Sequence, residues 1–237
     1  MLNDIKGYIF DYGGTLDTGG MHWGKALWHA YERQQVPVTE EMFREGYVHA
    51  ERTLGKNRII MPDFTFRRTL DTKLRIEMEY IAEQQPGFVI EEWHGKVLDD
   101  IYSMTCRHTA ESRKVLQQLK ERGKRMVLVS NFYGNVATVL EEMGFAGMFE
   151  SIVESAVVGI RKPDHRIFTL GVEALGLQAG ECVVVGDSYD KDIEPAKKAG
   201  CYTIWIKGEG WTNDKPDGTH ADAVIGKLEE IDKIIKI

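Results

Sequence analysis

Three short apolar runs lie far apart along the chain, and each one leads directly into a polar or glycine-containing turn. They are Tyr8–Phe10, Arg125–Ser130 (RMVLVS) and Cys182–Gly186 (CVVVG). Short runs rich in β-branched residues, without polar alternation, are typical of parallel strands that are buried on both faces. Two further strands are indicated, strongly at Cys201–Ile206 and weakly at Ile152–Val153. The sequence therefore predicts an α/β protein built on a parallel sheet.

Segments with helical periodicity lie between these strands. They are Glu111–Arg122, Val136–Met143, Arg166–Leu175 and Ile193–Ala199. A glycine follows each of them, as often happens where a helix ends. Because strands that alternate with helices form a parallel sheet between two helical layers, we expect helices on both faces of the sheet.

Residues 11–124, between the first strand and the second, contain no convincing strand. Four segments there carry apolar residues at helical spacing: Lys25–Gln34, Glu40–Leu54, Phe64–Glu83 and Glu91–His108. An insertion of this size is too long for an ordinary crossover connection. We therefore expect a helical cap domain at residues 19–109, inserted between the two parts of a core domain, residues 1–18 and 110–237.

The composition is that of a globular protein, with 43% hydrophobic and 28% charged residues in a chain of 237. The net charge of −7 argues against nucleic acid as the main partner, because a phosphate backbone requires a basic surface. A local basic pocket for one small anion is compatible with this charge. The sequence does not indicate an oligomeric state.

The chain also lacks signals for export or membrane insertion. The start, MLNDIKGYIF, has neither the long apolar stretch nor the small-residue cleavage site of a signal peptide. No run approaches the roughly 18 apolar residues that span a bilayer. The three cysteines, Cys106, Cys182 and Cys201, form no CxxC pair, which is typical of reduced thiols. We expect a cytoplasmic protein without a membrane partner.

Polar side chains follow each of the three principal strands. Asp11 begins DYGGT after the first, Ser130 and Asn131 end the second, and Asp187 and Asp192 (GDSYDKD) follow the third. The segment GIRKP, which contains Lys162, precedes a predicted helix. Each feature alone is compatible with a strand end, a helix cap or a solvated lysine. Because parallel strands place their carboxyl ends at one ligand-binding edge, the combination predicts a site.

These groups are suited to phosphoryl transfer. An aspartate is ionised at neutral pH, so Asp11 can attack phosphorus without a general base and form an aspartyl phosphate. Asp187 and Asp192 beside it would bind Mg²⁺, which prefers oxygen ligands and offsets the repulsion between nucleophile and substrate. Ser130 and Lys162 would hold the remaining phosphoryl oxygens, together with backbone N–H groups of the glycine turn.

The ordered set of motifs resembles the four sequence motifs of the haloacid dehalogenase superfamily, whose commonest members are Mg²⁺-dependent phosphatases. The motifs are Asp11 with Gly14-Thr15, then Ser130, then Lys162, then Gly186-Asp187 with Asp192. The resemblance covers residues 4–18 and 111–208, and it extends to the cap by placement only. It implies a Rossmann-like core, a helical cap over the site, and hydrolysis of a small phosphorylated molecule through an aspartyl phosphate.

The resemblance also implies a role for each motif residue. Asp11 is the implied nucleophile, and Ser130 and Lys162 are the other implied catalytic residues. The implied metal ligands are Asp11, the backbone carbonyl of Gly13, Asp187 and Asp192. The implied phosphate contacts are Gly14, Thr15, Ser130, Asn131 and Lys162.

The chain departs from the phosphatase pattern at Gly13. Phosphatases of this family usually carry a second aspartate two residues after the nucleophile, which protonates the leaving group and then activates water. Acid–base catalysis of this kind accelerates a reaction by about 10²–10⁴-fold. The protein would then favour good leaving groups such as acyl or aryl phosphates, or Asp17 would supply the missing acid.

Two other functions stay open because of Gly13. The branch of the family that cleaves phosphonoacetaldehyde has a small residue there and forms a Schiff base with a cap lysine; Lys25 and Lys56 are cap lysines here. A protein that has lost turnover would be a non-catalytic phosphate-binding protein. A dehalogenase is disfavoured, because that branch usually has tyrosine at this position and works without the metal that Asp187 and Asp192 indicate.

Substrate specificity is expected to depend on the cap, where the sequence is least informative. The candidate contacts are His22, Trp23, Lys25, Lys56, Arg58, Arg67 and Arg68. For each of them, packing or a solvated helix face is the stronger explanation. The segment Gly208–Trp211 is a candidate for a loop near the site.

Overall fold

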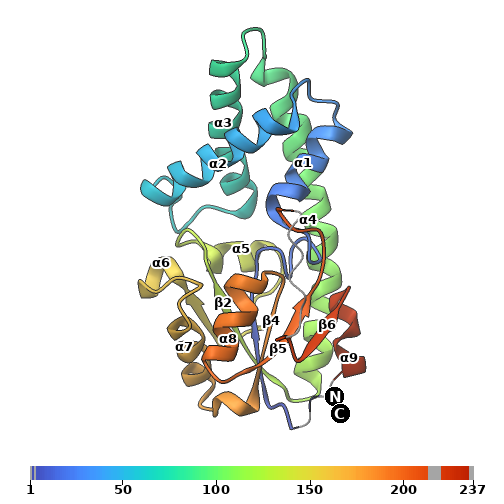
Figure 1. The fold of residues 1–237 in the computed structure, drawn as a ribbon, viewed down its shortest axis with the longest axis vertical. Coiled ribbons are helices and arrows are strands. Elements are labelled where there is room, and N and C mark those ends of the chain that lie inside the picture. The colour runs from blue at the N-terminus through green and yellow to red at the C-terminus, as the bar shows by residue number, and fades with distance from the viewer. Residues whose placement is uncertain (1, 3, 213–219, 235–237) are drawn as a thin grey trace.

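The computed structural model describes residue 2 and residues 4–212 and 220–234. Within these residues, one sheet has the strand order β3-β2-β1-β4-β5-β6, and all neighbouring strands are parallel. The strands are β1 (Gly7–Phe10), β2 (Arg125–Ser130), β3 (Ser151–Glu154), β4 (Cys182–Gly186), β5 (Tyr202–Ile206) and β6 (Ala223–Ile225). The prediction of an α/β fold on a parallel sheet is confirmed (Figure 1).

The five predicted strands are present, whereas β6 has no clear signal in the sequence. This edge strand has three residues, and only Ile225 among them is buried. Every residue of β1 and β4 is buried, which explains why these strands have no polar alternation. Since β1 pairs with β2 on one side and β4 on the other, the turns that follow these three strands meet at one edge.

Helices pack on both faces of the sheet. They are α5 (Val136–Glu142), α6 (Ser155–Val158), α7 (Arg166–Leu175), α8 (Glu194–Lys198) and α9 (Ile231–Ile234), with the single turns η1 (Ala179–Glu181), η2 (Tyr189–Ile193) and η3 (Leu228–Glu230). Alternate residues of β1 belong to different clusters. Tyr8 and Phe10 pack with residues of α5, while Ile9 packs with residues of α7 and α8.

Four helices form a layer beyond the carboxyl ends of the strands (Figure 1). They are α1 (Trp23–Arg33), α2 (Glu40–Lys56), α3 (Phe66–Gln84) and α4 (Ile90–Glu121). One of them, α4, continues along the sheet (Figure 1). Thr39 and Thr65 cap α2 and α3, because their hydroxyls accept hydrogen bonds from the N–H groups of Met42 and Arg68. In the part of the chain that the structure describes, no helix is both long and apolar enough to cross a membrane.

The prediction of two separate helices at 91–108 and 111–122 is wrong, because α4 is one helix of 32 residues. Its buried face contains Thr105, Thr109 and Ser112, which interrupt the apolar pattern without interrupting the helix. The Thr109 hydroxyl donates to the carbonyl of Thr105 at 2.9 Å, and the Ser112 hydroxyl donates to the carbonyl of Leu16 at 2.8 Å. The division into core and cap between residues 109 and 110 stays a prediction, and α4 passes through that point without a break.

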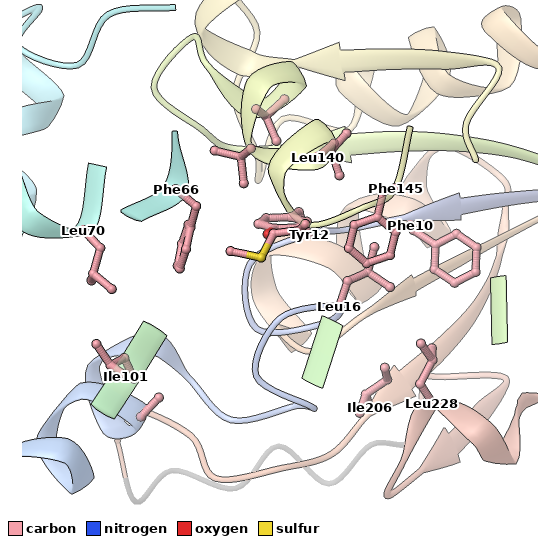
Figure 2. Packing of buried hydrophobic residues seen from close by; sticks show 14 of the residues in the cluster. Phe10, Tyr12, Leu16, Phe66, Leu70, Ile101, Leu140, Phe145, Ile206 and Leu228 are labelled. Carbon is pink, nitrogen blue, oxygen red and sulfur yellow. The ribbon is translucent and has the colours of Figure 1, made fainter. Parts of the chain in front are cut away.

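One hydrophobic cluster joins the helical layer to the sheet (Figure 2). Leu70 of α3 and Ile101 of α4 lie at one end of the labelled residues, and Phe10 lies toward the other. Tyr12 lies between them, with its ring centroid 5.9 Å from Phe132 and 6.4 Å from Phe145. The turn after β1 is therefore packed from both sides by apolar side chains.

A buried carboxyl group lies inside the helical layer. Glu77 of α3 is fully buried, and neither of its carboxyl oxygens has a hydrogen-bond partner within the described residues. Burial raises the pKa of Glu77 to about 8, although the nearby Tyr31 hydroxyl and Lys73 ammonium act in the opposite direction. The carboxyl group is thus mostly neutral below this pH.

Glu77 should make the folded state less stable as the pH rises. Its pKa is about 8 in the folded protein against an ordinary value of 4.5, so the folded state binds the proton more tightly. The stability that this group contributes at low pH is therefore lost as the pH rises between these two values. We expect Glu77→Gln to remove this loss, which is on the order of a few kcal/mol in the free energy of unfolding.

Urea unfolding of both proteins at about pH 5 and about pH 8.5 measures the effect. The matched control is Glu79→Gln, on an exposed position of the same helix, which should keep the wild-type pH dependence. Identical pH dependence in Glu77→Gln and wild type would contradict the prediction.

Candidate functional site

Asp11 lies directly beyond the end of β1. Its N–H donates to the carbonyl of Val185 at 3.0 Å, so the pairing of β1 with β4 continues one residue past the strand. Ser130 ends β2 and Asp187 follows β4, which places both next to the end of β1. Asp11 and Ser130 are 5% and 1% exposed, so both groups are almost removed from bulk water.

Three carboxylates form a cluster, and the ammonium group of Lys162 pairs with two of them. Asp11, Asp187 and Asp192 each offer an oxygen, and these atoms lie within 4.8 Å of one another. Lys162 Nζ donates to Oδ1 of Asp11 at 2.6 Å and to Oδ1 of Asp192 at 2.7 Å. The structure thus brings together the predicted nucleophile, the predicted lysine and the two predicted acidic metal ligands.

This cluster has an excess of negative charge. Burial raises the pKa of Asp187 well above its ordinary value, and repulsion from Asp192 and Asp11 adds to the effect. Burial also raises the pKa of Asp192 to about 6, although Lys162 acts in the opposite direction. With one lysine for three carboxylates, two negative charges remain when all groups are ionised. A divalent cation would balance them, and Mg²⁺ fits a set of carboxylate oxygens.

The glycine turn after Asp11 supports Asp187. Gly14 has a φ of +96°, and a Cβ atom there would lie 2.4 Å from the Asp187 carboxyl group. The Thr15 hydroxyl donates to Oδ1 of Asp187 at 3.1 Å and lies 3.4 Å from Oδ2 of Asp11. Gly14 and Thr15 are therefore positioned to orient the carboxylates, and their predicted contact with phosphate stays a prediction.

Asn131 holds the segment that carries Lys162. Its side-chain amide donates to the carbonyl of Lys162 at 3.1 Å and accepts from the N–H of Lys162 at 3.0 Å. The pair of bonds fixes the lysine backbone against the end of β2. Asn131 and Ser130 also line the cavity that opens above Asp11, so both remain candidates for phosphate contact.

Asp17 is held inside the turn. Its Oδ1 accepts from the N–H of Gly14 at 2.7 Å, and its Oδ2 accepts from Nε1 of Trp23 at 2.9 Å. Burial raises the pKa of Asp17 to about 8. The residue is fully buried and does not line the cavity, so in this arrangement its carboxyl group faces the turn rather than a substrate.

Gly13 lines the cavity beside Asp11, and nothing in its own geometry requires glycine. Its φ is not positive, in contrast to that of Gly14. A Cβ atom at Gly13 would lie 3.6 Å from the indole of Trp23, which is an ordinary contact. The absence of the second aspartate is therefore not explained by backbone strain.

The cavity above Asp11 has a volume of about 200 Å³ and is walled by the sheet edge and the helical layer. Of the predicted cap contacts, His22 and Trp23 line it, whereas Lys25, Lys56, Arg58, Arg67 and Arg68 do not. Lys25 pairs with Glu40 at 2.9 Å instead. Further lining residues, which were not predicted from the sequence, include Tyr47, Glu51, Lys73, Tyr133 and Lys191.

Lys73 is the buried cation on the cap side of the cavity. Its ammonium group donates to Glu51 and lies 4.1 Å from the ring centroid of Tyr47. The Tyr133 hydroxyl donates to Glu51 at 3.2 Å, which links the end of the sheet to α2. Burial alone would lower the pKa of Lys73, but the Glu51 carboxylate holds it above its ordinary value. A lysine within the apolar stripe of α3, beside Leu74, is the sequence signal for this residue.

His22 presents a neutral ring to the cavity. Its Nδ1 accepts from the N–H of Gly24 at 3.0 Å, which assigns the proton of the neutral ring to Nε2. Burial lowers the pKa of His22 to about 4. The ring is therefore a hydrogen-bond donor at neutral pH and is poorly suited to replace a catalytic acid.

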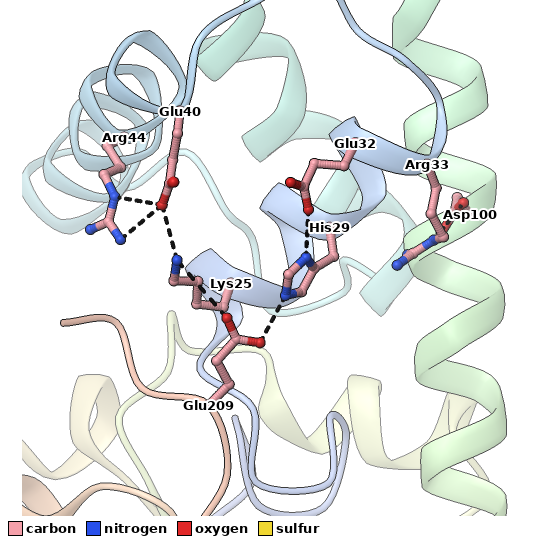
Figure 3. Close-up of polar contacts among 8 residues, drawn as sticks. All are labelled: Lys25, His29, Glu32, Arg33, Glu40, Arg44, Asp100 and Glu209. Carbon is pink, nitrogen blue, oxygen red and sulfur yellow. Dashed lines mark hydrogen bonds and ion pairs between the residues drawn. The ribbon is translucent and has the colours of Figure 1, made fainter. Parts of the chain in front are cut away.

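The predicted loop at Gly208–Trp211 reaches from the end of β5 to α1 and α2. The Glu209 carboxylate contacts His29 at 2.8 Å (Figure 3). Arg44 Nη2 donates to the carbonyl of Trp211 at 2.9 Å. The ring of Trp211 packs 5.0 Å from that of Tyr47 and 5.2 Å from that of His22, measured between centroids. The loop therefore packs against two residues of the cavity wall, His22 and Tyr47.

Comparison with known sequences identifies relatives of the chain. The sequence model of the haloacid dehalogenase-like hydrolases matches residues 5–200. A glyceraldehyde 3-phosphate phosphatase from Methanocaldococcus jannaschii is 34% identical over 52% of this chain and 54% of that protein. A phosphoglycolate phosphatase from Vibrio cholerae is 27% identical over 97% of this chain and 98% of that protein. The chain spans about half the length of the first of these relatives.

Solved structures share the fold. A dehalogenase determined with an intermediate complex has a TM-score of 0.66 at 16% identity and covers 99% of both chains. A putative hydrolase of the same family from Bacillus subtilis, bound to magnesium, has a TM-score of 0.61 at 18% identity and covers 98% of this chain and 99% of that one. At these identities the likeness concerns the fold alone.

Alanine should affect the two neighbouring glycines unequally. At Gly14 a Cβ atom would meet the Asp187 carboxyl group at 2.4 Å, whereas at Gly13 it makes an ordinary contact. We expect Gly14→Ala to weaken Mg²⁺ binding by roughly tenfold or more, because Asp187 must move. Gly13→Ala, the matched control, should change it by less than about twofold. Calorimetric titration with Mg²⁺ measures both, and equal affinities in the two variants would contradict the assignment.

Proposed function

Because the chain belongs to the haloacid dehalogenase-like hydrolases, we propose that it is a Mg²⁺-dependent phosphatase of a small phosphorylated metabolite. The observation that carries the proposal is the position of Asp11, which lies in a cluster of three carboxylates, pairs with Lys162 and opens into a cavity. The relatives described as phosphatases of glyceraldehyde 3-phosphate and phosphoglycolate support it.

In the proposed reaction, a carboxylate oxygen of Asp11 attacks phosphorus. Lys162 Nζ contacts Oδ1 of Asp11 at 2.6 Å and fixes the carboxylate, which leaves Oδ2 to form the new O–P bond. The bond from phosphorus to the leaving group breaks at the same time, and the leaving group takes the electron pair. Water then hydrolyses the aspartyl phosphate, which releases phosphate and restores Asp11.

The other site residues hold the reacting groups in place. Asp11, Asp187 and Asp192 would bind Mg²⁺, which would offset the repulsion between the carboxylate and the phosphoryl group. The hydroxyl of Ser130 and the ammonium group of Lys162 would contact phosphoryl oxygens. Asp11, Ser130, Lys162 and Asp192 are buried and Asp187 is partly buried, so their interactions with charge are stronger than in water.

The cavity supports a small-molecule substrate. It has a volume of about 200 Å³, and the predicted nucleophile and metal ligands lie in its lining. We include a cytoplasmic location in the proposal, and the free thiols of Cys106, Cys182 and Cys201 are compatible with it. The net charge of −7 gives no support to a nucleic-acid partner.

The groups around the cavity support substrates whose leaving group needs no proton. Gly13 supplies no acid, Asp17 is bonded inside the turn, and His22 is a neutral ring with a pKa of about 4. The leaving group of an acyl phosphate is a carboxylate and that of an aryl phosphate is a phenolate, and both depart as stable anions. Turnover of simple alkyl phosphates should be slower, because their alkoxides require protonation.

Lys73 is the observation that favours a phosphonate hydrolase as a second candidate. It lines the cavity, whereas the cap lysines Lys25 and Lys56 do not. A Schiff base forms from a neutral amine, however, and Glu51 keeps the pKa of Lys73 above its ordinary value against the effect of burial. The ammonium form of Lys73 therefore favours the phosphatase over the phosphonate reaction.

Phosphate release separates an enzyme from a non-catalytic binding protein. With Mg²⁺ we expect turnover of p-nitrophenyl phosphate and acetyl phosphate, and a loss of about a hundredfold or more when EDTA removes the metal. Asp11→Asn should lower the rate by roughly a thousandfold or more, since the amide is a poor nucleophile. Asp190→Asn, at an exposed aspartate outside the cluster, is the control and should retain the rate.

The non-catalytic alternative has a different signature. Neither substrate would be turned over, and Asp11→Asn would behave as the wild type does. That result would contradict the proposed phosphatase.

Gly13→Asp tests the missing acid directly. The surroundings of Gly13 leave room for a side chain, since the nearest atoms to a Cβ at this position would be those of the Trp23 indole at 3.6 Å. If the absence of an acid limits turnover, the change should raise the rate for alkyl phosphates by about tenfold or more and that for aryl phosphates much less. Measured kcat values for ethyl and p-nitrophenyl phosphate give the comparison. Equal effects on both would assign Gly13 another role.

A further inference from the structure

A second hollow, here called the basic groove, adjoins the cavity. It has a volume of about 930 Å³ and lies between the end of α2 with the loop after it and the segment around α6 (Figure 1). Its charged lining residues are Glu51, Arg52, Lys56, Arg58 and Arg161. Residues that line both hollows are Glu51, Phe132, Tyr133 and Arg161. The two hollows therefore adjoin at these residues.

The acidic and basic side chains that line the cavity are equal in number, without counting those of the basic groove. Four acidic and four basic side chains line the cavity: Asp11, Glu51, Asp187 and Asp192, and Lys73, Arg161, Lys162 and Lys191. Mg²⁺ would add two positive charges, and a phosphate monoester carries nearly two negative charges at neutral pH. Metal and phosphoryl group together therefore leave the cavity close to electrical neutrality.

The basic groove adds three cations that have no such counter-charge. Arg52, Lys56 and Arg58 are exposed, and none of them forms an ion pair within 4.0 Å in the described part of the chain. The one carboxylate among the described groove residues, Glu51, is paired with Lys73. This local excess of positive charge lies on a chain whose net charge is −7.

We propose that the substrate carries a second anionic group, which binds in the basic groove while the phosphoryl group occupies the cavity. The inference rests on the proposed phosphatase function and adds the substrate class, a phosphate ester with a phosphate or carboxylate at its far end. Guanidinium and ammonium groups bind both anions. Arg161, which lines both hollows, lies along the path between the two anions.

Binding of phosphonates tests the second site independently of turnover. The probes are alkylphosphonates of increasing chain length, the matching α,ω-bisphosphonates, and the matching ω-carboxyalkylphosphonates, titrated calorimetrically with Mg²⁺ present. We expect the best bisphosphonate to bind roughly tenfold tighter than its monophosphonate, because each of several exposed charge contacts contributes a few-fold. The advantage should shrink as salt is added. The carboxylate series shows which second anion is preferred.

Two triple variants locate the effect. Replacing Arg52, Lys56 and Arg58 by Gln should abolish the preference for the second anion. The control replaces Arg75, Lys198 and Lys227 by Gln; these exposed cations line neither hollow, and their loss changes the net charge equally. The control variant should keep the preference, which excludes a long-range effect of charge.

The outcomes separate this inference from the proposed function. Wild-type protein that hydrolyses p-nitrophenyl phosphate but binds mono- and bisphosphonates equally would overturn the second anion site alone. A preference that survives in the groove variant would also overturn it. Wild-type protein that shows the preference and loses it in the groove variant, yet turns over no phosphate, would support the groove and overturn the phosphatase function.

Discussion

The buried ammonium group of Lys162 is the interaction on which the site depends. It lies 2.6 Å from Asp11 and 2.7 Å from Asp192, in surroundings that strongly disfavour unpaired charge. Breaking a buried pair by removing one partner typically costs about 3–5 kcal/mol. The rest of the site is arranged around this contact, because Asn131 fixes the lysine backbone while Thr15 orients the nearby Asp187. The end of β1, the loop that carries Lys162 and the turn η2 are thereby held in fixed positions relative to one another.

The arrangement of the sheet could be predicted from the sequence because it follows from local patterns. Strands buried on both faces are continuously apolar. Polar ligand-binding residues therefore lie beyond the carboxyl ends of these strands. That logic brings Asp11 to the same edge as Asp187 and Asp192, whereas Lys162 reaches the cluster from the loop before α7. The length of α4 could not be predicted in the same way, because Thr109 and Ser112 satisfy their hydroxyls inside its buried face and so look like a break.

The residues of the helical layer that line the cavity were difficult to predict from the sequence. Lys73 contacts Glu51 from a different helix, and Tyr133 reaches the same carboxylate from the end of the sheet. Such contacts depend on how helices cross, which composition and periodicity do not encode. Arg67 is a candidate substrate contact in the sequence because it is a cation. In the structure it pairs with Asp99 on the outside of the helical layer. Lys73 is buried and lines the cavity, whereas Arg67 is exposed and does not.

The hydrogen bonds of Asp17 link the position of the first cap helix to the alignment of the nucleophile. One oxygen holds the N–H of Gly14 in the turn after Asp11, and the other holds the indole of Trp23, the first residue of α1. A rotation of α1 away from the sheet must either break the bond to Trp23 or pull on the turn. One buried carboxylate therefore couples the position of α1 to that of the turn that follows the nucleophile.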